Sequence, residues 1–226
     1  MRLPPRDAFR SVIFDFDFTL ADSSNGIFDC VNTALAAMGV PPARRDDVNA
    51  TIGLPLRETF TRLTGSDDAA RQAEFVAKFH CRADEVMVDS AVLYEFVPAT
   101  IKEIRRQGVS LGMATTKRRV HVEAILKRDG LADAFHTVIG GNDVSNQKPH
   151  PESLLAGLKG LGVPPRECVY VGDSIVDAEA ARRAEMPFVA VLTGVTKRAA
   201  FDSFAAREIL NHAGELPAWL EAARNR

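Results

Sequence analysis

The second half of this chain alternates short apolar segments with longer amphipathic ones, and few folds accommodate that pattern. Each apolar segment has the length of a buried strand, and the segments between them carry apolar residues at helical spacing. Strands that alternate with helices favour a parallel sheet covered on both faces, with right-handed crossovers. The expected strands lie at 109–114, 136–139, 168–171 and 188–192, and the expected helices at 98–107, 117–128, 151–161, 175–185 and 215–223.

The first half differs, because the segment from about residue 24 to residue 92 contains no convincing strand. Helices are expected there at 24–38, 55–63 and 67–88. An unbroken helical stretch inside an alternating pattern indicates an insertion. The sequence therefore predicts an α/β protein whose Rossmann-like parallel-sheet core is formed by residues 1–22 and 93–226. Residues 23–92 are expected to form an inserted α-helical cap domain.

A further apolar strand is expected within the stretch Val12–Leu20, which carries two aspartates, Asp15 and Asp17. Residues i and i+2 of an extended chain share a face, so both carboxylates are expected to point the same way. Two carboxylates at the end of an apolar strand repel each other and are costly to bury unless a cation joins them. Mg²⁺ is the natural candidate because it prefers oxygen ligands. The competing interpretation is that the strand runs into an ordinary solvated acidic turn.

Polar residues also follow the other expected strands. Ligands of such sheets bind at the carboxyl ends of the strands, so these residues are expected to gather at one edge. Taken singly they have simpler interpretations: Thr115 could cap a helix, and Lys148 could be a solvated loop lysine. Asp173 and Asp177 could occupy a helix start, where the dipole favours acidic residues. Together with the aspartates of the first strand, they would place a hydroxyl, an ammonium and at least three carboxylates at one edge.

Such a set of groups suits phosphoryl transfer. A carboxylate can attack phosphorus and form an acyl phosphate, provided that a metal ion separates it from the dianionic substrate. A second carboxylic acid can give a proton to the leaving oxygen and later retrieve one. A hydroxyl and a lysine can hold the remaining phosphoryl oxygens, over which the charge spreads.

The order of these residues resembles that of the four motifs of the haloacid dehalogenase superfamily. The matching segments are Asp15-Phe16-Asp17-Phe18-Thr19-Leu20, Thr115, Lys148-Pro149 and Gly172-Asp173-x3-Asp177. The resemblance spans residues 10–222, and it is closer to the phosphoglycolate-phosphatase-like branch, in which a helical cap follows the first motif. It implies a phosphatase that hydrolyses a small phosphomonoester, with 2-phosphoglycolate the best single candidate.

The resemblance also implies a role for each matched residue. Asp15 would be the nucleophile that forms an aspartyl phosphate, and Asp17 the general acid and base. Thr115 and Lys148 would bind the phosphoryl group. The implied Mg²⁺ ligands are Asp15, the Asp17 backbone carbonyl, Asp173 and, through water, Asp177.

Two positions depart from the family pattern. Phe18 stands where the family usually has glycine, so this loop must accept a bulky side chain. Thr116 stands where asparagine commonly follows the motif threonine, which affects a contact to the phosphoryl group or the nucleophile. Thr19 and Thr116 are both assigned to substrate binding by their place in the motifs. Neither departure removes a charged catalytic group, so activity is still expected.

The expected cap contains one candidate substrate loop, at Thr51–Glu58, which resembles the specificity loop of the family. Gly53 would let the backbone approach a ligand, and the helix start after Pro55 offers free N–H groups to an anion. Arg57 could bind a substrate carboxylate. A solvated helix arginine is the competing interpretation.

Charge and hydropathy exclude several classes of partner. The chain of 226 residues has a net charge of −2 and a pI of about 6.2, so there is no basic excess for nucleic acid or an anionic membrane. No apolar run approaches the ~20 residues of a membrane span. The first seven residues lack the apolar core of a signal peptide. We therefore expect a cytoplasmic monomer or homodimer whose partner is a small phosphate ester.

The cysteines and histidines indicate neither a disulfide framework nor a metal centre. The cysteines are odd in number and far apart, which favours reduced, packing side chains. Three histidines show no metal-ligand spacing and are expected as surface or loop residues. The cysteines are Cys30, Cys81 and Cys168, and the histidines are His121, His136 and His150.

Several other activities share part of this set of residues. Asp17 and Asp173 argue against a true dehalogenase, which does not need this metal-binding set. Phosphonate cleavage in related hydrolases uses a cap lysine, but Lys78 lies on a long expected helix rather than in the candidate loop. A sugar-phosphate mutase or an inorganic pyrophosphatase would share the core motifs. A catalytically silent protein that binds a phosphorylated metabolite is the alternative from another class.

Overall fold

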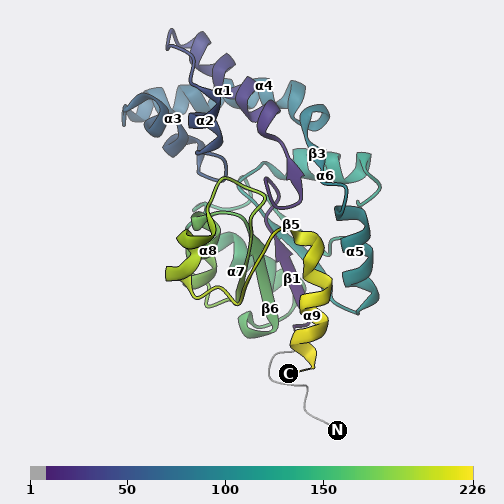
Figure 1. The fold of residues 1–226 in the computed structure, drawn as a ribbon. Coiled ribbons are helices and arrows are strands. Elements are labelled where there is room, and N and C mark those ends of the chain that lie inside the picture. Colours follow the sequence, from purple (N-terminus) through teal and green to yellow (C-terminus); the bar gives the residue numbers. More distant parts are fainter. Residues whose placement is uncertain (1–8, 226) are drawn as a thin grey trace.

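A computed structural model describes residues 9–225, and its centre is a six-stranded parallel sheet (Figure 1). β1 lies in the middle, between β4 and β6, so the strand order reverses at β1. The expected α/β fold with a parallel sheet is confirmed. The strands are β1 (Ser11–Phe14), β4 (Ser110–Ala114), β5 (Thr137–Ile139), β6 (Cys168–Gly172), β7 (Phe188–Val191) and β8 (Glu208–Leu210), in the order β5-β4-β1-β6-β7-β8.

Helices cover both faces of this sheet. Three helices contribute to a hydrophobic cluster on one face, namely α5 (Val97–Arg106), α6 (Arg119–Arg128) and α9 (Leu216–Arg224). Two helices contribute to the cluster on the other face, namely α7 (Glu152–Leu161) and α8 (Ile175–Arg183). In Figure 1 the two groups lie on opposite sides of the central strands. Short 3₁₀ segments occur at Pro165–Glu167, Arg198–Phe204 and Ala213–Glu215.

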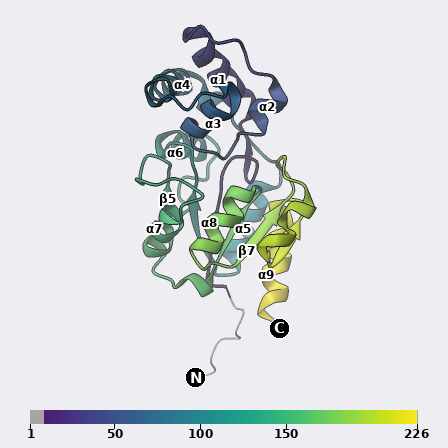
Figure 2. The same cartoon turned by 90° about the vertical axis from the view of Figure 1, so that its left-hand side faces the viewer.

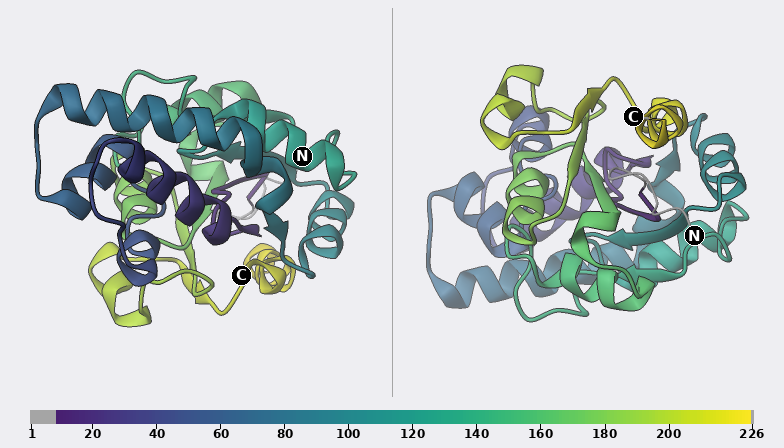
Figure 3. Two further views of the ribbon diagram at one scale, coloured as in Figure 1. Left: turned by 90° about the horizontal axis from the view of Figure 1, so that it is seen from above. Right: turned by 90° about the horizontal axis from the view of Figure 1, so that it is seen from below.

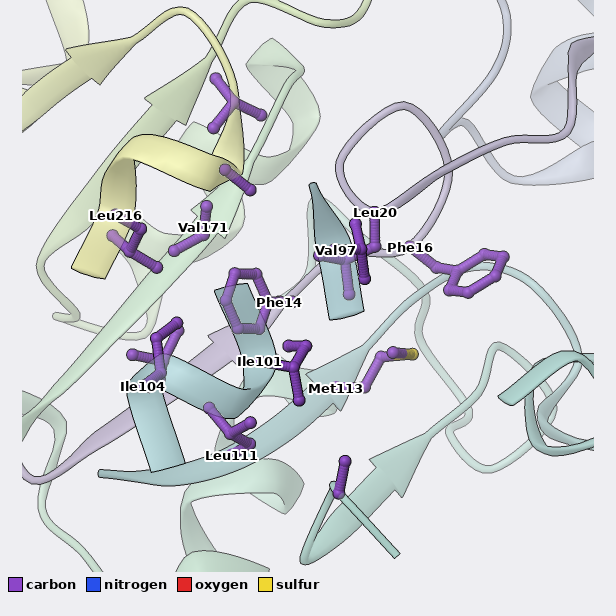
Figure 4. Packing of buried hydrophobic residues seen from close by; sticks show 14 of the residues in the cluster. Phe14, Phe16, Leu20, Val97, Ile101, Ile104, Leu111, Met113, Val171 and Leu216 are labelled. Carbon is purple, nitrogen blue, oxygen red and sulfur yellow. The ribbon is translucent and has the colours of Figure 1, made fainter. Parts of the chain in front are cut away.

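The alternation of side chains along β1 explains why both faces are apolar. Val12 and Phe14 belong to the cluster on the α5 face, and Ile13 between them belongs to the cluster on the α7 face. All three side chains are fully buried. Figure 4 shows Phe14 among Ile101 and Ile104 of α5 and residues of neighbouring strands. A strand that is buried on both faces has a continuous run of apolar residues in its sequence, and this run is what predicted β1.

Four helices gather at one end of the core (Figure 2). They are α1 (Ser24–Ala37), α2 (Arg45–Asn49), α3 (Leu56–Thr64) and α4 (Ala69–Ser90). They have a hydrophobic cluster of their own, in which the rings of Phe60 and Phe75 lie 5.4 Å apart and those of Phe75 and Phe79 6.2 Å apart. A hydrophobic cluster separate from those of the core agrees with a helical cap. The exact domain boundaries at residues 23 and 92 stay a prediction.

A short antiparallel ribbon joins these helices to the sheet. It pairs β2 (Ala21–Asp22) with β3 (Val92–Leu93), so the chain leaves and re-enters the core at neighbouring points. Sequence reasoning did not find this ribbon, because two residues per strand are too few for a periodic pattern. The edge strand β8 was also missed for its length, since it has only three residues.

The long helix α4 crosses the end of the core and packs on α6 (Figure 3). At the crossing, Asp84 of α4 accepts hydrogen bonds from Arg118 at 2.7 Å and from His121 Nε2 at 2.8 Å. His121 is only 5% exposed. The expectation that His121 is a surface or loop residue is therefore wrong, because α4 covers the α6 surface that carries it. His136 and His150 are exposed, as expected.

Within residues 9–225, no helix is both long and apolar enough to cross a membrane. The first eight residues, which include the segment without a signal-peptide pattern, lie outside the described part of the chain.

Candidate active site

The parallel register brings three strand ends to one edge of the sheet. Asp15 follows β1, Thr115 follows β4 and Asp173 follows β6, and these three strands are direct neighbours. All three side chains are buried, with exposures of 2–5%. The site thus forms where the strand order reverses, which is where open α/β sheets bind their ligands.

Lys148, from the loop between β5 and α7, reaches into this edge and is 1% exposed. Its Nζ lies 2.9 Å from Asp15 Oδ1 and 2.6 Å from Asp177 Oδ1. It also lies 2.9 Å from the hydroxyl of Tyr170. Burial alone would lower the pKa of Lys148, but the two carboxylates outweigh burial and raise it. Lys148 is therefore a fixed positive charge beside Asp15.

Asp177 is held by several donors at once. Tyr170 donates its hydroxyl hydrogen at 2.8 Å to the carboxylate oxygen that Lys148 contacts. The other oxygen accepts from Ser174, in a capping box that starts α8. The close approach requires glycine at position 172, because a Cβ there would lie 2.6 Å from Asp177. This arrangement makes Asp177 the residue that orients Lys148.

Three carboxylates, those of Asp15, Asp173 and Asp177, have oxygen atoms within 4.8 Å of one another. Burial, opposed by Lys148 and assisted by Asp177, raises the pKa of Asp15 to about 7. Burial, followed by repulsion from Asp177 and Asp15, raises the pKa of Asp173. When all three buried carboxylates are ionised, the single ammonium leaves excess negative charge, and burial together with this charge raises these pKa values without a metal ion. An all-oxygen donor set of this kind fits Mg²⁺, which would neutralise that charge.

Asp17 lies beside the cluster and has a different partner. Its Oδ1 is 3.1 Å from the Nζ of Lys117, and both side chains are less than 10% exposed. Sequence reasoning placed Lys117 at the first turn of a helix, whereas α6 begins only at Arg119. Lys117 is thus a loop residue whose side chain can turn back toward the sheet edge. The only signal in the sequence was its place in the polar stretch after β4.

The threonines assigned from the motifs take different places. Thr19 is fully buried, and its hydroxyl donates to Asp173 Oδ1 at 3.4 Å. Thr115 accepts a hydrogen bond from the backbone N–H of Lys117 at 3.2 Å. Thr116 lines the large cavity described below. The structure thus shows Thr19 supporting a carboxylate, and the substrate contacts of all three stay predictions.

Phe18, the bulky residue at the usual glycine position, adopts a left-handed backbone conformation with φ of 58°. Such values favour glycine, because a Cβ crowds the backbone there. The side chain is buried at 8% exposure, and the hydroxyl of Thr193 donates to its carbonyl oxygen. The loop therefore keeps a glycine-like conformation while it buries an aromatic ring.

A cavity of about 900 Å³ lies between the helical segment, where α1, α3 and α4 line it, and the core. Its walls include Asp17 and Lys117 on the core side and the loop around Gly53 on the other. Gly53 has φ of 93°, and a Cβ there would come within 3.7 Å of Ser174 Oγ. Arg57 also lines the cavity, and its side chain is exposed. The candidate substrate loop therefore shares this cavity with Asp17 and lies near Ser174, which donates a hydrogen bond to Asp177.

Sequence reasoning missed Lys117, Tyr170 and Ser174 as site residues. Tyr170 stands in the apolar strand β6, and nothing in that pattern indicated that its hydroxyl contacts Lys148 and Asp177. Ser174 had a detectable signal, since Ser-x-x-Asp is a capping box. Lys117 and Tyr170, in contrast, contact Asp17 and Lys148, which are distant in sequence, and a local pattern does not reveal such contacts.

Comparison with known proteins agrees with this geometry. Residues 12–191 match the model of the family described as haloacid dehalogenase-like hydrolase. The phosphoglycolate phosphatase of Salmonella typhimurium is 34% identical over 206 residues, which is 82% of each chain. That of Shigella flexneri is 33% identical over 214 residues, or 85% of each chain. A solved haloacid dehalogenase-like protein of Bacteroides fragilis has a TM-score of 0.89 at 35% identity, covering 92% of this chain and 99% of its own.

Proposed function

This chain belongs to the haloacid dehalogenase-like hydrolase family, and from that premise we propose that it is a Mg²⁺-dependent phosphatase. Its reaction would pass through an aspartyl phosphate on Asp15, and its substrate would be a small phosphomonoester. The observation that carries the proposal is the buried group of Asp15, Lys148 and Asp173 at the strand ends, next to Asp17. The side chains that phosphoryl transfer requires are gathered there, and Asp17 lines the adjoining cavity.

Asp15 is the proposed nucleophile. One of its oxygens would attack phosphorus, so that a bond to Asp15 forms while the bond to the leaving oxygen breaks. Lys148 holds the Asp15 carboxylate in place at 2.9 Å, and its ammonium would also attract the phosphoryl oxygens. Thr115 would hold a further phosphoryl oxygen. Fixed donors of this type stabilise charge that develops in the transition state.

Asp17 is the proposed general acid and base. In the first step its carboxylic acid would give a proton to the leaving oxygen, so that an alcohol departs. In the second step its carboxylate would take a proton from water as the water oxygen attacks phosphorus. The bond between phosphorus and Asp15 then breaks, inorganic phosphate is released, and both aspartates return to their starting states.

Asp15, Asp173 and the Asp17 backbone carbonyl would hold Mg²⁺, and Asp177 would act through water. A bound Mg²⁺ would screen the negative nucleophile from the negative substrate. The excess of buried carboxylates over ammonium groups in this cluster supports the assignment.

For the substrate we propose 2-phosphoglycolate. Two relatives at 33–34% identity are phosphoglycolate phosphatases. Arg57 lines the same cavity as Asp17, and there it could bind the carboxylate of this substrate.

Turnover of a panel of phosphate compounds tests the proposed function. The panel would contain 2-phosphoglycolate, a hexose phosphate, a nucleoside monophosphate and pyrophosphate, each with Mg²⁺ and with EDTA. We expect phosphate release from 2-phosphoglycolate with the highest kcat/KM, and its loss in EDTA. A preference for pyrophosphate, or product isomerisation without phosphate release, would contradict the proposal. Binding without turnover would indicate a silent sensor.

A further inference from the structure

Lys117 is a buried cation to which the mechanism above gives no role. Its side chain is 5% exposed, and its Nζ forms an ion pair with Asp17 Oδ1 at 3.1 Å. An ammonium removed from water is costly unless it has a partner. A charge kept at that cost beside the proposed proton donor calls for an explanation.

The backbone of Lys117 is held on both sides. Its N–H donates to Thr115 Oγ1 at 3.2 Å, and its carbonyl oxygen accepts from the N–H of Gly141 at 2.9 Å. Its side chain therefore starts from a defined point. Because α6 begins two residues later, no helical turn directs this side chain away from the sheet edge.

Two further side chains confine the ammonium. The Lys117 Nζ lies 5.9 Å from the centre of the Phe16 ring, a cation–π distance. It also lies 3.1 Å from the sulfur of Met87, which belongs to α4. A thioether sulfur is a weak hydrogen-bond acceptor, so Met87 contacts the ammonium group but does not balance its charge. The ion pair with Asp17 is thus the strong contact of Lys117.

We propose that Lys117 is a positioning residue that holds the carboxyl group of Asp17 in the orientation required for proton transfer. The inference rests on the proposed function. A proton donor must keep its oxygen near the leaving oxygen, and misplacement by about 1 Å can cost about a hundredfold in rate. Asp17 lies in the loop after β1, where its side chain needs outside support. Lys117 provides that support by binding one oxygen, which leaves the other for the substrate.

Two other roles for Lys117 predict different kinetics. If Lys117 bound an anionic part of the substrate, its removal would affect only substrates that carry a second charge. If it served the fold alone, its removal would affect all substrates equally. A positioning role predicts losses that follow the leaving group, because only a poor leaving group needs the proton of Asp17.

The test compares kcat/KM of wild type and Lys117→Met on three substrates. Ethyl phosphate has a poor, uncharged leaving group, para-nitrophenyl phosphate has a good one, and 2-phosphoglycolate adds a carboxylate to a poor one. We expect a loss of about ten- to a hundredfold for ethyl phosphate and 2-phosphoglycolate, and less than about threefold for para-nitrophenyl phosphate. Lys127→Met, at an exposed lysine of α6, is the matched control and should equal wild type.

A double mutant with Asp17→Asn completes the test. If Lys117 acts through Asp17, Lys117→Met should cause no further loss with ethyl phosphate in the Asp17→Asn background. A full additional loss would overturn the inference. Equal losses on ethyl and para-nitrophenyl phosphate, or a loss confined to 2-phosphoglycolate, would also overturn it.

Unfolding and failure of the proposed function are separable from these outcomes. Circular dichroism checks that each variant is folded, and Lys117→Gln replaces Lys117→Met if the latter does not fold. If wild type hydrolyses none of the three substrates, the proposed function fails and this inference fails with it. If wild type is active but the leaving-group pattern is absent, only the role of Lys117 is wrong.

Discussion

At the scale of single residues, the site depends on a small number of buried charges that orient one another. Asp177 holds Lys148, and Lys148 holds Asp15. Lys117 is paired with Asp17 in the same way. Buried pairs of this type lose much more when one partner is removed than when both are replaced. Substitutions that keep shape but change charge are therefore the informative ones.

The first prediction concerns the nucleophile. Asp15→Asn should preserve the fold and lower kcat by ~10³-fold or more, since an amide oxygen is a poor nucleophile. Steady-state phosphate release measures this, and acid-quenched wild type should yield a phosphorylated peptide that contains Asp15. Asp133→Asn, at an exposed aspartate, is the control. Substantial residual activity of purified Asp15→Asn would show that another residue attacks phosphorus.

The second prediction concerns Arg57. Arg57→Ala should raise KM for 2-phosphoglycolate about tenfold or more, because it removes a charge-assisted hydrogen bond of ~1.5–3 kcal/mol. KM for para-nitrophenyl phosphate should hardly change. Arg62→Ala, at an exposed arginine of the same helix α3, is the control. Similar losses on both substrates would assign Arg57 to the stability of the cap, and no loss would make it a solvated surface residue.

At the scale of elements, each helix shows one face to a cluster and the other to solvent. Cys30 lies on the buried face of α1, whereas Cys81 lies on the exposed face of α4. Cys168 begins the central strand β6 and is fully buried. The three cysteines therefore report on three different environments.

Thiol labelling tests this arrangement. Burial, assisted by Asp29, raises the pKa of Cys30 to about 12, and burial raises that of Cys168. At about pH 8, iodoacetamide should modify Cys81 and leave the other two unmodified until the protein is denatured. Peptide mass spectrometry before and after denaturation provides the measurement. Rapid labelling of Cys30 in the native protein would mean that the cluster around α1 is not closed.

At the scale of the whole molecule, the contact between α4 and α6 links the four cap helices to the core. At this crossing Asp84 accepts hydrogen bonds from both Arg118 and His121. Burial lowers the pKa of His121, although its hydrogen bond with Asp84 acts in the opposite direction. His121 is therefore neutral in the folded protein near neutral pH, while in an unfolded chain it takes up a proton more readily.

This difference predicts a pH-dependent stability. A histidine whose pKa is lower in the folded state stabilises the fold above its unfolded pKa of about 6.5, and this contribution is lost as the pH falls further. Tm should thus be lower at about pH 5.5 than at about pH 7.5, and His121→Gln should reduce the difference. His150→Gln, at an exposed histidine, is the control. An unchanged pH dependence in His121→Gln would exclude His121 as its source.

The sequence by itself determined the α/β fold and the edge at which the chemistry gathers. Strand and helix periodicity are local properties, and parallel strands must bring their carboxyl ends to one side. Asp15 and Asp173 could therefore be placed together although 158 positions separate them along the chain.

Tertiary structure alone decided which surfaces meet. Periodicity tells that a face is buried but not what covers it, so nothing local revealed that α4 covers His121. In the same way, the partners of Lys117 and Tyr170 come from other segments of the chain. A sequence does not reveal that a polar group is buried unless its partner is known, because the partner offsets the free-energy cost of burying the group.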